Sequence, residues 1–162
     1  KIPTFVKNGI YPTAKIRGEE MLGSFNNMKG NAATGRFESA MISPPSQTFM
    51  EIPVCGYLGE KGMSLNLMVE GSNKPIELIP YKVVREGLIP IYVRTPAKPF
   101  RIVAVDNNPE LWFSFAAPRG IGKLSVYSQW LLRYGQTIFT LGALLMALML
   151  NPKVFNSLTR SE

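Results

Sequence analysis

The residue types that most often carry out catalysis are scarce in this sequence. Its 162 residues include no histidine, and Cys55 is the single cysteine. Without histidine there is no imidazole to act as general base, and one cysteine can form neither an internal disulfide nor a zinc site. The remaining source of an acid/base pair is the carboxylates, and the candidates are Glu38, Glu51, Glu70, Glu77 and Asp106. We therefore expect no enzymatic activity, no metal site and no cofactor.

The segment from Asp106 to Glu110 is rich in oxygen donors. It reads Asp-Asn-Asn-Pro-Glu, and Ca²⁺ takes about six to eight oxygen ligands. The spacing is not that of an EF-hand loop, and Asp and Asn before Pro are also typical of a tight turn. The sequence favours the turn over a calcium site.

Three aromatic residues form a candidate ligand platform. Trp112 lies in the aromatic sequence Trp-Phe-Ser-Phe, and Tyr92 and Tyr57 lie in other predicted strands. Exposed rings of this kind stack on sugars, so these residues could bind a glycan. Burial in a sandwich core is the alternative, and the sequence favours burial.

The net charge of +7 is spread along the chain. The surplus of basic residues lies mainly in the N-terminal 35 residues and in the C-terminal tail, whereas nucleic-acid binding requires a concentrated basic face. The glycine-containing segment 118–123 matches neither phosphate-binding pattern. We expect no nucleic-acid partner, and we assign the basic residues to solvent or lipid headgroups.

Short apolar alternations between residues 36 and 118 predict a mainly β domain, an antiparallel β-sandwich of jelly-roll type. The clearest strand is 63–70, where Met63, Leu65, Leu67 and Val69 share one face. Further strands are predicted at 36–43, 49–57, 76–84, 88–94, 100–105 and 111–117. Three prolines within these runs indicate edge strands or bulges, because proline cannot donate a ladder hydrogen bond: Pro53, Pro80 and Pro90.

The segments that flank this domain lack such alternation. Residues 1–35 are predicted to form an irregular arm with one strand at most, which lies on a partner. Residues 119–123 are predicted to be a linker. Because the sequence begins with Lys1 rather than Met, we expect an upstream segment, either a signal peptide or another helix.

The C-terminal part predicts one helix over 124–151 and a short tail over 152–162. Residues 137–150 carry no charge, and counting back through Trp130 gives about 20 residues, which matches a hydrocarbon core of about 30 Å. We therefore expect a single-pass transmembrane helix, with a buried or interfacial helix as the alternative. Basic residues flank both ends, so the charge distribution favours neither orientation.

Two sets of helix residues have expected roles at the membrane. Trp130, Arg133 and Tyr134 should mark one interface, where the rings form a belt and the arginine reaches the headgroups. Gly142, Ala143 and Ala147 form a small-residue stripe that permits close approach of another membrane helix.

Two sequence stretches carry a resemblance to a known kind of domain. They are Phe-Arg-Ile-Val-Ala-Val-Asp at 100–106 and Leu-Trp-Phe-Ser-Phe-Ala-Ala-Pro at 111–118, with support from 35–39, 43–45 and 54–57. The region 30–135 resembles a β-sandwich accessory domain, related in form to carbohydrate-binding domains, that occurs in extracytoplasmic regions of bacterial membrane proteins and precedes a transmembrane helix. The resemblance implies a fold and a periplasmic-side location, and it implies no catalytic residues.

The sequence therefore supports two functional hypotheses. The first is a non-catalytic, single-pass accessory subunit that assembles with other membrane protein subunits in the lipid bilayer, with energy-transducing and photosynthetic complexes among the candidates. The second is a membrane-anchored module that binds a glycan of an envelope polysaccharide system. An enzyme would require two of the carboxylates named above within about 5–10 Å in one cleft.

Overall fold

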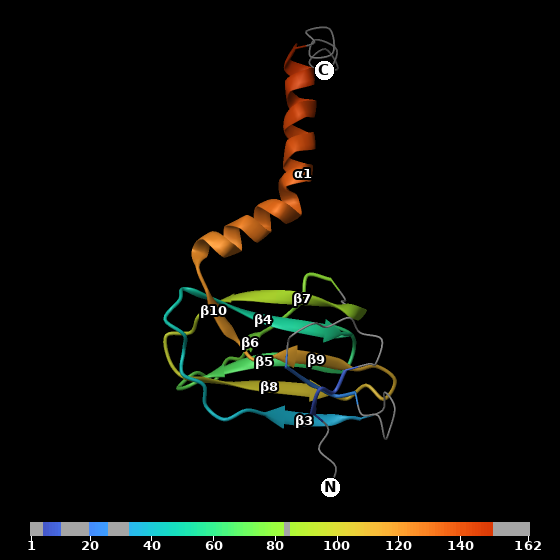
Figure 1. Cartoon of the computed structure of the whole chain (residues 1–162), viewed down its shortest axis with the longest axis vertical. Coiled ribbons are helices and arrows are strands. Elements are labelled where there is room, and N and C mark those ends of the chain that lie inside the picture. Colours follow the sequence, from blue (N-terminus) through green and yellow to red (C-terminus); the bar gives the residue numbers. More distant parts are fainter. Residues whose placement is uncertain (1–4, 11–19, 26–32, 83–84, 151–162) are drawn as a thin grey trace, which may run out of the picture. The chain divides into compact units, whose positions relative to one another are not determined.

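A computed structural model describes residues 5–10, 20–25, 33–82 and 85–150, and the statements that follow concern these residues. The chain divides into two compact units, Lys1–Gly122 and Lys123–Glu162. The first unit is built from antiparallel strands and the second contains a helix (Figure 1). We describe each unit by itself.

The larger of two sheets in the first unit contains six described strands. In spatial order five of them are β1 (Val6–Lys7), β2 (Met21–Gly23), β9 (Phe113–Ala116), β4 (Phe49–Gly56) and β10 (Arg119–Ile121). The sixth, β7 (Arg85–Arg94), pairs with β4 over most of its length. Strand β4 is therefore the centre of this sheet.

The second sheet contains four described strands, in the order β3 (Gly35–Glu38), β8 (Phe100–Asp106), β5 (Met63–Val69) and β6 (Ile76–Glu77). Figure 1 shows β3, β8 and β5 side by side. Every pairing in both sheets is antiparallel. The predicted mainly β, antiparallel fold is confirmed.

The core lies between the two sheets, as the alternation of side chains requires. On β5, Met63, Leu65 and Leu67 are buried while Ser64 and Asn66 are half-buried, so the face predicted from the sequence is the buried one. The facing side chains of the other strands complete the cluster. They include Met50, Ile52, Val54, Phe100, Ile102, Phe113 and Phe115.

A second apolar cluster covers the outer face of the six-stranded sheet. Cys55 on β4 and Ala116 on β9 point to this face, and Trp112 and Phe25 pack over them from outside the strands. The Phe25 and Trp112 rings meet edge to face, with centroids 6.0 Å apart. Both faces of β4 are therefore buried near its end, which is why its alternation is lost there.

The ends of the domain differ from the prediction. The expected N-terminal arm contributes two short strands, β1 and β2, and the expected linker contains β10, which pairs with β4. Phe5 and Met21 from the arm are buried in the core clusters. The arm and linker are thus parts of the sandwich, and the stretches 1–4, 11–19 and 26–32 of the predicted arm lie outside the described residues.

Several predicted strands are shorter or displaced. The strand expected over 36–43 ends at Glu38 as β3, with Ile42 forming an isolated bridge to Phe100. Of the strand expected over 76–84, residues 76–82 contain only β6, Ile76–Glu77, while 83–84 lie outside the described residues; β7 begins at Arg85, before the predicted 88. After β3, the Ser39 hydroxyl accepts a hydrogen bond from the Ile102 N–H at 2.9 Å, so a side chain takes the place of a ladder carbonyl where the strand ends.

The three prolines have different positions. Pro53 and Pro90 face each other in the β4–β7 pair, and the register shifts between Val54 and Gly56. On its other side β4 pairs with β10 through Glu51 and with β9 from Val54 onward, so Pro53 lies where the partner changes. The expected bulge is present next to Pro53, whereas Pro80 lies outside any strand.

The second unit contains α1, which spans Lys123–Leu150, close to the predicted 124–151. Its first half combines apolar residues with Ser125, Ser128, Gln129, Arg133 and Gln136. Among the described residues we find no helix with both the length and the apolarity that crossing a membrane requires. The transmembrane helix expected from the sequence is therefore not found there, and the predicted tail over 152–162 lies outside the described residues.

Candidate functional site

Of the five carboxylates considered for an acid/base pair, Glu70 and Glu77 are exposed, and two others are ion-paired within the sandwich. Glu38 on β3 is ion-paired with Arg101 and Arg36, and Glu51 on β4 is ion-paired with Arg119. These two glutamates belong to different sheets. Within the described residues, no three His, Cys, Asp or Glu side chains cluster as metal ligands do.

The oxygen-rich segment forms a turn. The Asp106 carboxylate accepts a hydrogen bond from the Asn108 N–H at 2.9 Å, and the Asn108 side-chain oxygen accepts hydrogen bonds from the N–H groups of Glu110 and Leu111 at 2.9 and 3.0 Å. The Asn108 amide also donates to the Lys61 carbonyl. These oxygens hold the backbone of the turn. This is the role that the sequence favoured over calcium binding.

Asp106 itself is fully buried at the end of β8. Its Oδ2 atom has no hydrogen-bond partner among the described residues. Burial raises the pKa of this carboxyl, and the nearby Ser24 hydroxyl and the Asn108 N–H oppose the rise. We assign no strong bond to Ser24, because its hydroxyl is engaged with the Phe113 backbone, so Asp106 is a buried structural group with one unsatisfied oxygen.

The candidate aromatic platform is not formed at Trp112, for which the sequence favoured burial. Trp112 is 3% exposed, because its ring packs in the cluster on the outer face of the six-stranded sheet. Tyr57 is half-buried against both apolar clusters, and Tyr92 lies on β7 opposite Glu51. A buried indole cannot stack on a sugar, so burial, the alternative that the sequence favoured, is correct for Trp112.

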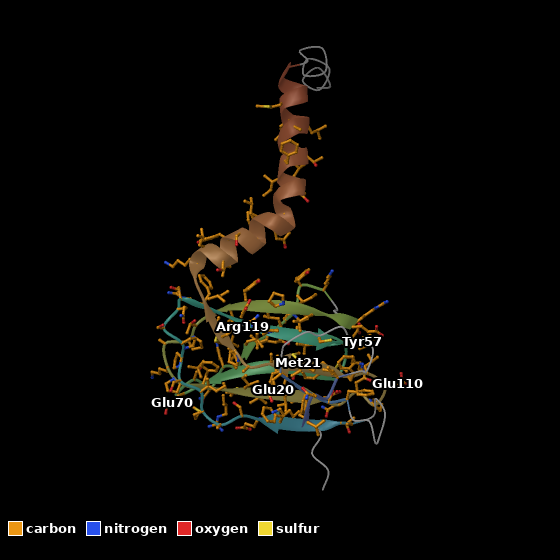
Figure 2. The ribbon with its side chains drawn as sticks, viewed as in Figure 1. Glu20, Met21, Tyr57, Glu70, Glu110 and Arg119 are labelled. Atoms are coloured by element: carbon orange, nitrogen blue, oxygen red, sulfur yellow. The ribbon has the colours of Figure 1, made fainter. Side chains whose placement is uncertain are left out.

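A groove that the sequence did not indicate lies on the four-stranded sheet. Its volume is about 360 Å³, and we call it the outer groove. Its polar lining comes from Arg36 and Glu38 on β3, Arg101 on β8 and Glu70 after β5. Its apolar lining comes from Met41, Met68, Val69 and Val103. Figure 2 shows Glu70 and Tyr57 at opposite ends of the sandwich, so Tyr57 does not belong to this groove.

Three of the four charged residues of the outer groove, Arg36, Glu38 and Arg101, form one network. The Glu38 carboxylate accepts hydrogen bonds from the Arg101 guanidinium and, at 3.3 Å, from the Arg36 guanidinium. These two hydrogen bonds, that of Arg101 first, lower the pKa of Glu38. The groove thus presents a fixed carboxylate acceptor between two guanidinium donors at neutral pH, beside apolar side chains.

A second hollow, which we call the apolar cleft, opens between the sheets near β2 and β3. It has a volume of about 340 Å³ and is bordered by the ion pair of Lys7 and Glu20. Its lining includes Met21, Leu22, Phe37, Ile42, Ile102 and Phe115. Most of these side chains also belong to the core clusters, so the cleft is an extension of the core.

Helix α1 carries the remaining predicted residues. Trp130 and Tyr134 are both exposed, and their rings lie 5.4 Å apart on neighbouring turns. Gly142 and Ala143 are exposed, and a Cβ added at Gly142 would meet nothing within 4 Å. The side chains of Arg133 and Ala147 lie outside the described part of the helix.

Most of the apolar side chains of α1 that the structure describes are exposed. Among these described side chains, the large apolar residues have exposed fractions from 41% at Tyr134 to 82% at Leu124. Phe139 and Met146 are 78% and 69% exposed, and with Gly142 and Ala143 they follow the spacing of one helix face. We call these four residues the lateral face.

The comparisons with known proteins assign no function to either the outer groove or the lateral face. No protein-family model matches this sequence, and the search of curated proteins gives no match.

Proposed function

We propose that this chain is a non-catalytic accessory subunit of a membrane protein complex. In this proposal the β-sandwich lies on the extracytoplasmic side, and α1 packs against helices of the partner at the bilayer. The observation that carries the proposal is the exposure of the large apolar side chains of α1. The resemblance of residues 30–135 to accessory domains of bacterial membrane proteins supports it.

The physical reason is the cost of leaving these side chains in water. Covering one large apolar side chain stabilises a protein by about 1.5–3 kcal/mol, and a soluble monomer seldom exposes a continuous apolar surface of more than a few hundred Å². Helix α1 exposes leucines, Ile138, Phe139 and Met146 over several successive turns. A helix of this kind is stable when lipid or other helices cover it.

The lateral face is suited to helix packing. Gly142 and Ala143 lie between Phe139 and Met146, so two large side chains flank a shallow, small-residue surface. A partner helix can approach closely over the small residues and pack against the large ones. Trp130 and Tyr134, one and two turns earlier, have the amphipathic rings that favour the headgroup region.

The sandwich is consistent with a non-catalytic role. Of the carboxylates considered from the sequence, Glu38 and Glu51 are ion-paired and Asp106 is buried in a turn. Glu38 shares the outer groove with Glu70, but arginines bind both oxygens of Glu38 and lower its pKa, whereas a general acid needs a raised pKa.

Affinity isolation of the tagged full chain from gently solubilised native membranes tests the proposal. The double variant Phe139→Ala/Met146→Ala removes large side chains from the lateral face and should lower the yield of the co-isolated partner at least about tenfold. Leu144→Ala, on another face of α1, is the matched control and should retain the partner. Equal loss of the co-isolated partner with both variants would mean that the lateral face is not the contact surface.

A second candidate function is glycan binding, which the outer groove favours. Sugar hydroxyls both donate and accept hydrogen bonds, and the groove supplies the Glu38 acceptor between the Arg36 and Arg101 donors. Met41, which is 44% exposed, and the half-buried Met68 offer an apolar surface for the C–H face of a sugar ring. The candidate site is therefore the outer groove, and Trp112 has no part in it.

Calorimetric titration with neutral oligosaccharides tests this second function. Binding by the full chain that is lost in Glu38→Gln and Arg101→Gln, and kept in the control Glu77→Gln on the same sheet, would support it. Binding that is unchanged in the first two variants would place any glycan elsewhere.

A further inference from the structure

The apolar cleft leaves part of the sandwich core open to the surface. Its lining includes Leu22 and Phe115 of the six-stranded sheet. It also includes Phe37 and Ile102 of the four-stranded sheet, and all four side chains pack in or against the core between the sheets. Protein interiors seldom contain voids larger than a water molecule, whose share of liquid volume is about 30 Å³, whereas the cleft measures about 340 Å³. The cleft therefore has room for a small ligand.

Phe5 shows how an apolar group enters between the sheets. It precedes β1 and belongs to neither sheet, yet it is buried, with its ring centroid 6.1 Å from that of Phe37 and 6.2 Å from that of Phe115. Because Phe37 and Phe115 also line the cleft, the hollow adjoins the space that Phe5 fills. An apolar molecule in the cleft would contact the same two rings and be stabilised by leaving water.

The side chains that line the cleft offer few hydrogen bonds to a ligand. Among the described lining residues, the polar side chains are Ser39, Lys7 and Glu20. The Ser39 hydroxyl already donates to the Ala40 carbonyl at 2.7 Å and accepts from the Ile102 N–H at 2.9 Å. A sugar, a peptide or a nucleotide would therefore lose hydrogen bonds to water without replacing them. The part of a ligand that enters the cleft must be apolar.

The ion pair of Lys7 and Glu20 gives the cleft a charged end. Lys7 on β1 lies opposite Leu22 in the β1–β2 register, and Glu20, labelled in Figure 2, directly precedes β2. Both charged side chains are mostly exposed, so a polar group bound to them stays in water. An ammonium group has three donors, so Lys7 can bind a second carboxylate besides Glu20.

We propose that the apolar cleft binds one fatty acyl chain, with the oxygens of its carboxyl end beside Lys7. The cleft lies at the small end of the range of about 300–1,000 Å³ for ligand sites, which suits a slim chain. A free fatty acid and a phospholipid both supply such a chain. The inference goes beyond the proposed function, because the cleft contains no residue of α1 and the outer groove lies on the other face of the four-stranded sheet.

Photoaffinity labelling of the full chain in lipid nanodiscs tests the proposal. The probe is palmitic acid with a diazirine in the middle of its chain, and mass spectrometry of the peptides locates the adducts. We expect adducts on peptides that contain Leu22, Phe37 or Ile42. Ala117→Trp places a large ring at an exposed position of the lining and should lower these adducts at least about tenfold. Asn73→Trp, an exposed position outside the lining, is the matched control and should leave them unchanged.

Three variants of the ion pair test the charged end. Lys7→Gln should lower cleft labelling by the acid about two- to fivefold and leave labelling by its methyl ester unchanged, because only the acid is charged. Lys7→Arg should retain labelling by the acid. Glu20→Gln should increase it, because the variant removes a competing carboxylate. These substitutions change exposed side chains, so they test the site even if Ala117→Trp fails to fold.

Each outcome of the labelling decides the question. Cleft adducts from the free acid alone identify a fatty acid, and equal adducts from a phospholipid with the same diazirine chain identify a membrane lipid; both support the proposal. Adducts confined to α1, or cleft adducts that persist in a folded Ala117→Trp chain, overturn it. An unchanged ratio of acid to ester labelling in Lys7→Gln overturns the role of Lys7. Co-isolation of the membrane partner should be unaffected by Ala117→Trp, so this inference and the proposed function can fail independently.

Discussion

Replacing Asp106 by asparagine should stabilise the sandwich at neutral pH. The Asp106 carboxyl is fully buried, and one of its oxygens has no hydrogen-bond partner among the described residues. Such an unsatisfied group costs about 1–3 kcal/mol, and more when it is charged. Asparagine keeps the acceptor for the Asn108 N–H but loses about 1 kcal/mol of charge assistance in that bond. We expect a net gain of about 1 kcal/mol in the free energy of unfolding at pH 7 for Asp106→Asn.

The stabilisation by Asp106→Asn should depend on pH, and the direction of that dependence can be checked. Because burial raises the pKa of Asp106, the folded state holds its proton to higher pH than the unfolded chain does. Stability therefore falls as pH rises from the ordinary value of 3.8 through the pKa of the folded state. Below that window Asp106 is neutral in both states, so the variant and the wild type should have nearly equal stability.

Urea unfolding at a series of pH values measures the difference. Trp112 is buried and can report unfolding by fluorescence, in a Trp130→Phe background that removes the second indole. We expect the difference in unfolding free energy between Asp106→Asn and the wild type to increase as pH rises. A variant that is less stable than the wild type at pH 7 would refute the reasoning, because it would mean that the carboxylate has a strong partner.

Three further predictions concern the sandwich. Gly56→Ala should lower the free energy of unfolding by more than about 3 kcal/mol, because φ is +89° and a Cβ would lie 2.4 Å from the Trp112 carbonyl oxygen. Gly59→Ala is its control and should cost only about 1–2 kcal/mol, since φ is +101° but the nearest atom is 3.8 Å away; similar urea midpoints for the two would contradict the clash. Native Cys55 should resist maleimide at pH 8, followed by mass spectrometry, and react once urea unfolds the chain; rapid native labelling would show that the thiol is accessible. Trp112→Ala should cost about 3–5 kcal/mol by urea unfolding, and an unchanged midpoint would mean that the indole does not hold the outer cluster together.

Strand alternation made the central part of the fold predictable. The strand 63–70 alternates over eight residues, and its buried face was identified correctly. Strands β1, β2 and β10 have only two or three residues, so they show no period that a sequence pattern could reveal. β2 forms because it pairs with β9 across more than 90 positions of sequence, and β10 forms because it pairs with the distant β4; local pattern contains neither interaction.

The outer groove was missed for a similar reason. Arg36 and Glu38 are two residues apart on one strand and so were recognisable as neighbours on one face. Arg101, however, reaches Glu38 only because β3 and β8 pair in a particular register. The burial of Trp112 likewise depends on Phe25, which packs over it from a distant part of the chain. The apolar content of residues 124–151 was enough to predict helix α1. It does not identify the molecule that covers the helix.

The central claim is that α1 joins this chain to another membrane subunit. The most direct test is isolation of the untruncated wild-type chain from its native membranes under gentle solubilisation, followed by identification and quantitation of every co-isolated protein. The proposal predicts an integral membrane protein in a fixed ratio to this chain. Recovery of the chain alone, as a monodisperse species with no other protein, would contradict it.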